Sequence, residues 1–136
     1  MGGFSSDVSR SEAFLRAADS LLRALGPSEV ILVLPVPVQQ TNADLGLATP
    51  VVEQISLTPA VVRKIGSSTS TRTQMEVMLS ASTVNDVAES RNFDPPNALF
   101  DAALGIMHGE KLLRIEGVSW ESFADAPYLY RILLTD

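Results

Sequence analysis

His108 is the only histidine of the chain, and imidazole can act as a general base or bind a metal. A serine nucleophile would need a turn of the G-x-S-x-G type, which the sequence lacks. The chain has no cysteine, and metal sites usually need several His, Cys or carboxylate ligands at close spacing. His108 precedes Gly109 at the expected end of a helix, where an imidazole interacts favourably with the helix dipole. We therefore expect His108 to have a structural role.

Two pairs of carboxylates have the residue types of a general acid and a general base. Asp94 with Asp101, and Glu116 with Glu121, could face each other across a groove. Arg114, however, stands two residues before Glu116 on the same face of an expected strand, which favours a solvated ion pair. No glycine-rich segment carries the lysine of a phosphate-binding loop. The sequence therefore predicts no enzyme activity, no metal and no cofactor.

The formal net charge is −6, so the chain lacks an overall basic surface for gripping nucleic acid. An acidic surface suits a wall past which DNA slides without binding, although acidity can also serve solubility alone. Arg63, Lys64 and Arg72 flank a Ser/Thr-rich tract at residues 66–73, which we expect to form a hairpin tip. These three cations could contact phosphate or an acidic neighbour, or they could simply be solvated.

The elements that position these side chains begin with a helix expected at residues 10–25. Ser9 can cap the helix, and Glu12 stands at the capping-box spacing. Gly26 followed by Pro27 is a stop signal. Residues 1–8 are expected to be a flexible N-terminus. One apolar stripe follows the helical period, formed by Phe14, Ala18, Leu21, Leu22 and Leu25.

The rest of the chain has the alternation and the turn residues of β-structure. Short helices are expected after a cap at Ser82 or Thr83, and again from Asn97 to a stop near Gly105 or Gly109. A turn is expected at residues 125–127. The fold predicted is α+β and mainly antiparallel: a single domain over residues 1–136, forming a small barrel or sandwich with an N-terminal helix and one or two short helices before the last strands. The strands are expected at residues 29–34, 51–57, 60–65, 74–80, 111–118 and 128–135.

Residues 35–50 are expected to form an extended arm or loop that carries Val36, Val38, Leu45 and Leu47. A loop with that many aliphatic side chains must pack on something, either the core of its own chain or a partner. With a partner, the arm would lie on the next subunit, and edge strands would pair between chains. The longest apolar run, residues 30–38, is broken by prolines and is too short to span a membrane.

Two segments near the C-terminus resemble a known family. The segment from Gly109 to Val118 reads GEKLLRIEGV and is followed by Trp120; the segment from Pro127 to Leu134 reads PYLYRILL. Together they resemble the closing strands of neck proteins of tailed bacteriophages, most closely the head-closure (stopper) family and less closely the tail terminators. The opening helix departs from the stopper pattern, because such a helix packed on a sheet is more common in tail terminators.

The resemblance implies a homo-oligomeric ring between head and tail, with the phage portal or adaptor and the tail proteins as partners. Double-stranded DNA would pass through without sequence-specific binding. The location implied is the virion neck, with the host cytoplasm during assembly. Ring contacts join two different patches, for which the arm at 35–50 and the strand edges near residues 60–80 are candidates, with Glu116 and Glu121 facing the channel. The alternatives are a tail terminator capping the tail tube and a small cytoplasmic protein-binding module.

Overall fold

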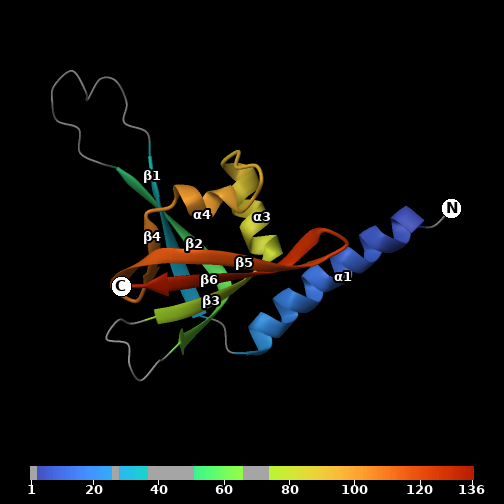
Figure 1. Cartoon of the computed structure of the whole chain (residues 1–136), viewed down its shortest axis with the longest axis horizontal. Helices are drawn as coiled ribbons and strands as arrows, with labels where there is room; N and C mark the ends of the chain where they lie inside the picture. The colour runs from blue at the N-terminus through green and yellow to red at the C-terminus, as the bar shows by residue number, and fades with distance from the viewer. Residues whose placement is uncertain (1–2, 26–27, 37–50, 66–73) are drawn as a thin grey trace, which may run out of the picture.

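A computed structural model describes residues 3–25, 28–36, 51–65 and 74–136. Six antiparallel strands close into a barrel in the order β1-β2-β3-β6-β5-β4 (Figure 1). This confirms the predicted α+β class and makes the architecture a barrel instead of a sandwich. The strands are β1 (Ser28–Pro35), β2 (Val52–Ile65), β3 (Gln74–Ser80), β4 (Gly105–His108), β5 (Lys111–Phe123) and β6 (Ala126–Thr135).

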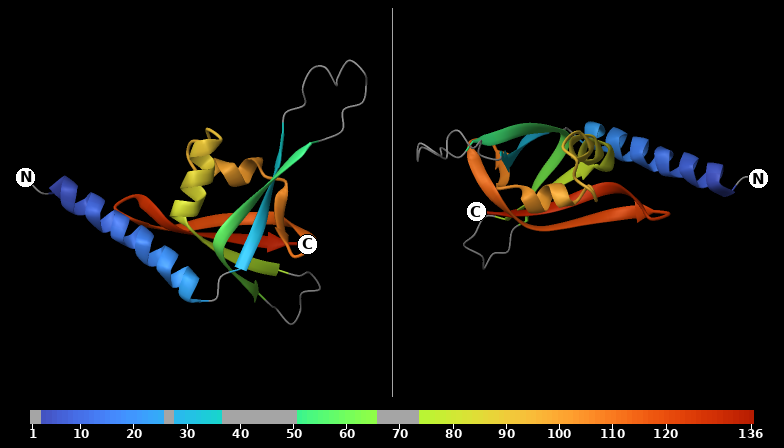
Figure 2. Two further views of the ribbon diagram at one scale, coloured as in Figure 1. Left: turned by 180° about the vertical axis from the view of Figure 1, so that it is seen from behind. Right: turned by 90° about the horizontal axis from the view of Figure 1, so that it is seen from above.

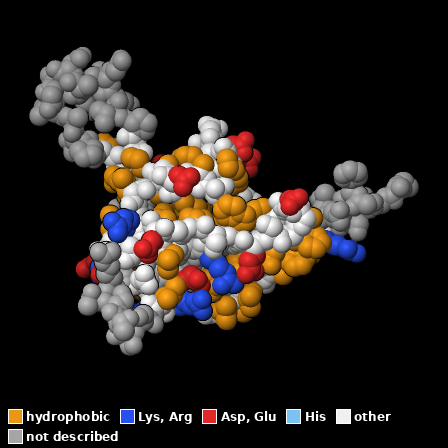
Figure 3. Space-filling model, viewed as in Figure 1, with side chains coloured by type: hydrophobic (Ala, Val, Ile, Leu, Met, Phe, Trp, Pro, Cys, Tyr) orange, Lys and Arg blue, Asp and Glu red, His pale blue; other side chains and the backbone are white. Residues whose placement is uncertain are grey.

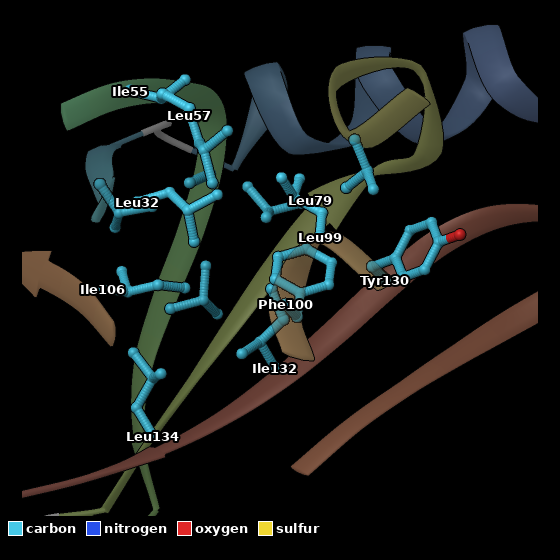
Figure 4. Close-up of a cluster of buried hydrophobic side chains, with 14 of the residues drawn as sticks. Leu32, Ile55, Leu57, Leu79, Leu99, Phe100, Ile106, Tyr130, Ile132 and Leu134 are labelled. Carbon is cyan, nitrogen blue, oxygen red and sulfur yellow. The ribbon is translucent and has the colours of Figure 1, made fainter. Parts of the chain in front are cut away.

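β2 is one continuous strand, where two were predicted around Pro59. It pairs with β1 as far as Ala60 and with β3 from Ala60 onward. The segment is therefore extended throughout, and what changes at this point is its partner. The core lies inside the barrel and under its short helices (Figure 4), and its largest fully buried side chains include Leu32, Leu57, Leu79, Leu99, Ile106, Tyr130, Ile132 and Leu134.

β4 was not predicted, and it closes the barrel between β1 and β5. The expected helix ends early, as α4 (Ala98–Ala102), so His108 belongs to a strand and the prediction of a helix-terminal His108 is wrong. Four residues are too few to show an alternation, so this strand was read as part of the helix. Gly105 allows the closure, because a Cβ there would lie 2.4 Å from the backbone oxygen of Leu113.

α1 (Gly3–Ala24) begins well before the predicted residue 10, so residues 3–8 belong to the helix. No proline interrupts this stretch, and the capping signal at Ser9 did not stop the helix from extending backwards. Of the predicted apolar stripe, Ala18 and Leu22 are buried. α1 packs against β2, β3 and β6 and continues beyond the barrel beside the β5–β6 hairpin (Figures 1 and 2).

α3 (Ala81–Ser90) is capped by Ser80, whose hydroxyl accepts a hydrogen bond from the Thr83 backbone at 3.4 Å. The predicted caps, Ser82 and Thr83, both lie inside this helix. The β5–β6 turn lies at Ala124 and Asp125, both with positive φ, slightly earlier than expected. The second short helix was expected to start at Asn97, and α4 begins at the next residue; the Asn97 side chain makes no capping hydrogen bond.

Candidate functional site

A row of alternating charges crosses four neighbouring strands, and we call it the charge ladder: Arg63 on β2, Glu76 on β3, Arg131 on β6 and Glu121 on β5. Arg63 contacts Glu76 at 2.9 Å, and Arg131 contacts Glu121 at 2.9 Å. Arg131 and Glu76 are 4.0 Å apart, which joins the two pairs. Acidic and basic side chains accordingly interleave on the front face of the molecule (Figure 3).

Tyr128 extends the ladder at its acidic end. Its hydroxyl donates a hydrogen bond to Glu121 Oε2 at 3.2 Å. Partial burial raises the pKa of Tyr128 above its ordinary value, and the hydrogen bond to the Glu121 carboxylate raises it further. The phenol therefore stays protonated and remains a donor, so Glu121 is held by two partners.

A hollow of about 470 Å³ lies between α4 and β5, and we call it the α4 hollow. Leu104 and Trp120 line it with 52% and 44% of their surfaces exposed, although both are large and apolar. Asp101, Arg114 and Glu116 supply its polar lining. Exposed apolar side chains gathered around a concave surface with a polar rim are typical of a protein-binding site.

A second hollow of about 350 Å³ lies between α1 and β6, and we call it the α1 groove. Phe14 and Leu21 line it with 39% and 57% of their surfaces exposed. The ring of Phe14 stacks on Phe123 at 4.7 Å and lies 5.0 Å from the ring of Tyr128, which fixes α1 against the hairpin. Glu121 and Arg131 of the charge ladder also line this groove.

The α4 hollow and the α1 groove lie on opposite faces of the β5–β6 hairpin. Trp120 pairs with the buried Tyr130, whereas Glu121 pairs with Leu129, which lines the α1 groove. Figure 2 shows α4 on one side of this hairpin and α1 on the other. The described part of the chain therefore exposes apolar side chains on two separate concave surfaces.

Several predicted interface residues lie within the described structure. Arg63 belongs to the charge ladder, Lys64 is exposed, and Val36 is half-buried and donates its backbone N–H to Val51 at 2.9 Å. Val38, Leu45, Leu47 and Arg72 lie outside the described residues. Glu76, Arg131, Leu104 and Trp120 were not predicted as interface residues.

The two predicted channel acids have different surroundings. Glu121 is paired with Arg131, while Glu116 is exposed in the α4 hollow. The expected ion pair between Arg114 and Glu116 does not form within the described part of the chain. The strand alternation is broken there by a bulge between Ile115 and Gly117, so the two residues are not placed as a regular strand would place them.

The residues considered for catalysis are not brought together by any contact. Asp94 is exposed in the turn after α3, and Asp101 is exposed on α4. The Nδ1 atom of His108 is buried without a hydrogen-bond partner in the described structure. Among the described residues, no group of three or more His, Asp or Glu side chains could hold a metal ion.

The fold and its surfaces define a class: a closed six-stranded antiparallel barrel with a packed N-terminal helix and two uncovered apolar surfaces. Comparisons with protein families, with curated proteins and with solved structures find no match. None of the helices within residues 3–25, 28–36, 51–65 and 74–136 has the length and apolar character needed to cross a membrane.

Proposed function

We propose that this chain is a structural subunit of the head-to-tail neck ring of a tailed bacteriophage, of the stopper type. In that role it joins the portal or adaptor to the tail and retains the packaged DNA. The proposal combines the resemblance of the two C-terminal segments with the surfaces of the barrel. It involves no turnover, because the subunit acts by holding its neighbours.

One observation carries the proposal: the two uncovered apolar surfaces lie on opposite faces of the β5–β6 hairpin. A head-to-tail contact joins two different patches on each subunit, and such a contact closes into a ring when its rotation permits. A large apolar side chain that moves from water into an interface gains about 1.5–3 kcal/mol. Trp120 and Leu104 on one face, with Phe14 and Leu21 on the other, therefore favour association.

The net charge of −6 fits this role, because an acidic wall does not bind the phosphate backbone. Glu116 is the more suitable of the two channel acids, since Glu121 is already paired with Arg131. We expect Glu116→Gln to slow DNA exit from assembled particles if Glu116 lines the bore. Unchanged ejection would remove Glu116 from that role.

A tail terminator is the second candidate, and the packing of α1 favours it. The helix lies against β2, β3 and β6. An opening helix packed on a sheet is the feature by which the sequence departs from the stopper pattern and resembles the tail terminators. Binding to purified partners separates the two roles. A stopper should bind the portal or adaptor complex, whereas a tail terminator should bind the end of the tail tube.

Assembly can be tested by mass photometry and negative-stain imaging over a range of concentrations, with and without purified portal–adaptor complexes. We expect rings, formed either alone or on the connector. Trp120→Ser should reduce assembly, while Leu112→Ser, which changes a similarly exposed apolar residue outside both surfaces and away from the 35–50 arm, should not. A chain that stays monomeric at every concentration and binds neither connector nor tail tube would contradict the proposal.

A further inference from the structure

We propose that the free edge of β5 in one copy pairs antiparallel with the free edge of β2 in the next copy, so that the charge ladder continues across the interface. The inference rests on the proposed ring and adds a backbone contact between neighbouring copies to the association of the apolar surfaces. The occupant of each edge is thus a second copy of this chain. Three features of the barrel support the pairing: two unpaired strand edges, their opposite charges and their opposite directions.

β5 and β2 both extend beyond the strand pairs that close the barrel. β5 pairs with β4 from Lys111 to Leu113, and from Arg114 onward its described partner is β6 alone. β2 pairs with β1 as far as Ala60, and residues 61–65 have β3 as their sole described partner. Beyond the closure, the strands β2-β3-β6-β5 thus form a four-stranded sheet whose two outer edges have no strand partner among the described residues.

Such edges are templates for pairing with another chain unless they are protected. Residues 115–123 of β5 contain no lysine and no proline, and Ser119, Trp120 and Ser122 are exposed. β5 itself carries one bulge residue on this edge, Glu116, while the second register shift, between Glu121 and Ser122, leaves the extra residue, Tyr128, on β6. The part of β5 beyond Glu116 is therefore available for a further strand.

The charge ladder makes the two edges complementary. It begins with the cation Arg63 on β2, at one edge, and ends with the anion Glu121 on β5, at the other. A second copy placed edge to edge would bring its Arg63 beside Glu121 and would continue the alternation of charges. Pairing of two β5 edges would instead bring two Glu121 carboxylates together, which is unfavourable. Charge therefore selects the head-to-tail contact.

The strand directions also agree. Each of the four strands is antiparallel to its neighbour, so β2 and β5 run in opposite directions. A rotation about a ring axis along the strands preserves the direction of β2, and the next copy therefore presents β2 antiparallel to β5. No strand needs to be reversed or exchanged.

The stagger of the ladder is compatible with a closed ring. Arg63 pairs with Glu76, which pairs with Leu133 of β6, so Arg63 lies level with Leu133. Glu121 pairs with Leu129 of β6 and lies level with it. The distance along β6 from Leu133 to Leu129 is about 13 Å, and a sheet of four strands is about 19 Å wide. A ring has no net rise between neighbours, so the strands would tilt by about 35° from its axis, as in closed barrels.

Site-specific cross-linking tests the contact directly, because the chain has no cysteine of its own. In the antiparallel register that places Arg63 opposite Glu121, Ile65 falls opposite Ser119. Ile65→Cys and Ser119→Cys are therefore made as two separate variants, mixed under ring-forming conditions and treated with a short bismaleimide. Any link between the two must then join different copies. Glu89→Cys, at an exposed position on α3, replaces Ile65→Cys in the control mixture.

We expect a cross-linked dimer from the first mixture, identified by peptide mass spectrometry as a link between positions 65 and 119, and none from the control. Rings without this link would overturn the edge pairing and leave the ring itself standing. A chain that assembles neither alone nor on connectors would overturn both. The two failures are thus distinguishable.

The charges give a second readout. Glu121→Gln and Arg63→Gln should each raise the concentration needed for assembly by about twofold to fivefold, the usual range for one exposed ion pair. Glu110→Gln removes an exposed acid from the β4–β5 turn and should change nothing. Thermal unfolding of each variant shows whether the barrel is intact. Equal assembly by all three folded variants would overturn the role of the ladder.

Discussion

Gly105→Ala tests the closure of the barrel, because β4 approaches β5 too closely at this point for a side chain. A Cβ at Gly105 would lie 2.4 Å from the backbone oxygen of Leu113 and 3.1 Å from Cδ1 of Leu112. Leu112 is exposed and can move, but the Leu113 backbone belongs to the β4–β5 pair and can shift only by loosening that pair. Overpacking of this kind costs about 1–3 kcal/mol. We expect a loss at the upper end of that range.

Gly117→Ala is the matched control. Gly117 also lies in a strand, on β5, but a Cβ there would meet nothing within 4 Å. Alanine restricts the unfolded chain more than glycine, so we expect no loss and a gain of up to about 1 kcal/mol. Urea unfolding followed by the fluorescence of Trp120 measures both values, with an unchanged m-value as the test that compactness is retained. A Gly105→Ala variant within about 0.5 kcal/mol of the parent would refute the reasoning.

Three further predictions concern α1, α3 and one ion pair. Leu22→Ala should lower the free energy of unfolding by about 2–5 kcal/mol, whereas Leu21→Ala, at the exposed neighbouring position, should change it little, as urea unfolding would show. Ser80→Ala removes the cap of α3 and should cost about 0.5–2 kcal/mol, measured by thermal unfolding. The hydrogen bond from Arg91 lowers the pKa of Glu53 below its ordinary value of 4.5. The ion pair of Glu53 with Arg91 therefore stabilises the fold above pH 4.5, and this stabilisation is lost as the pH falls through the lowered pKa. Unfolding midpoints from about pH 6 to about pH 3 should show this loss in the parent and not in Glu53→Gln.

The elements that follow one hydrophobic period over many residues were predictable from the sequence. β3 has the predicted bounds, Gln74–Ser80, with the side chains at Met75, Val77 and Leu79 buried as the alternation indicates. β4 was missed because its formation depends on contacts with β1 and β5, and not on its own residues. The beginning of α1 was missed because a local capping signal says where a helix can start, while the flanking chain decides whether it does.

The candidate site was only partly predictable. Arg63 and Glu121 were singled out for different reasons, and the structure places them at the two ends of one ladder. Glu76 and Arg131, which connect them, have no sequence signal, because their contact depends on the pairing of β3 with β6. The α4 hollow combines residues from two elements that are adjacent only in the closed barrel.

The bulge in β5 decides which face each side chain of the hairpin occupies. Before the bulge, Leu113 and Ile115 face the core; after it, Val118 packs against the core, and Trp120, on the same face of the strand, lines the α4 hollow. In a regular strand, side chains on one face are two residues apart, but the apolar residues Ile115 and Val118 are three apart in the sequence. A strand that keeps both on one face must therefore contain an extra residue between them. Without that residue, Trp120 would lie on the ladder face and Glu121 on the inner one. One inserted residue therefore places an apolar surface and a charged edge on opposite faces of the same strand, which is the separation that a head-to-tail contact needs.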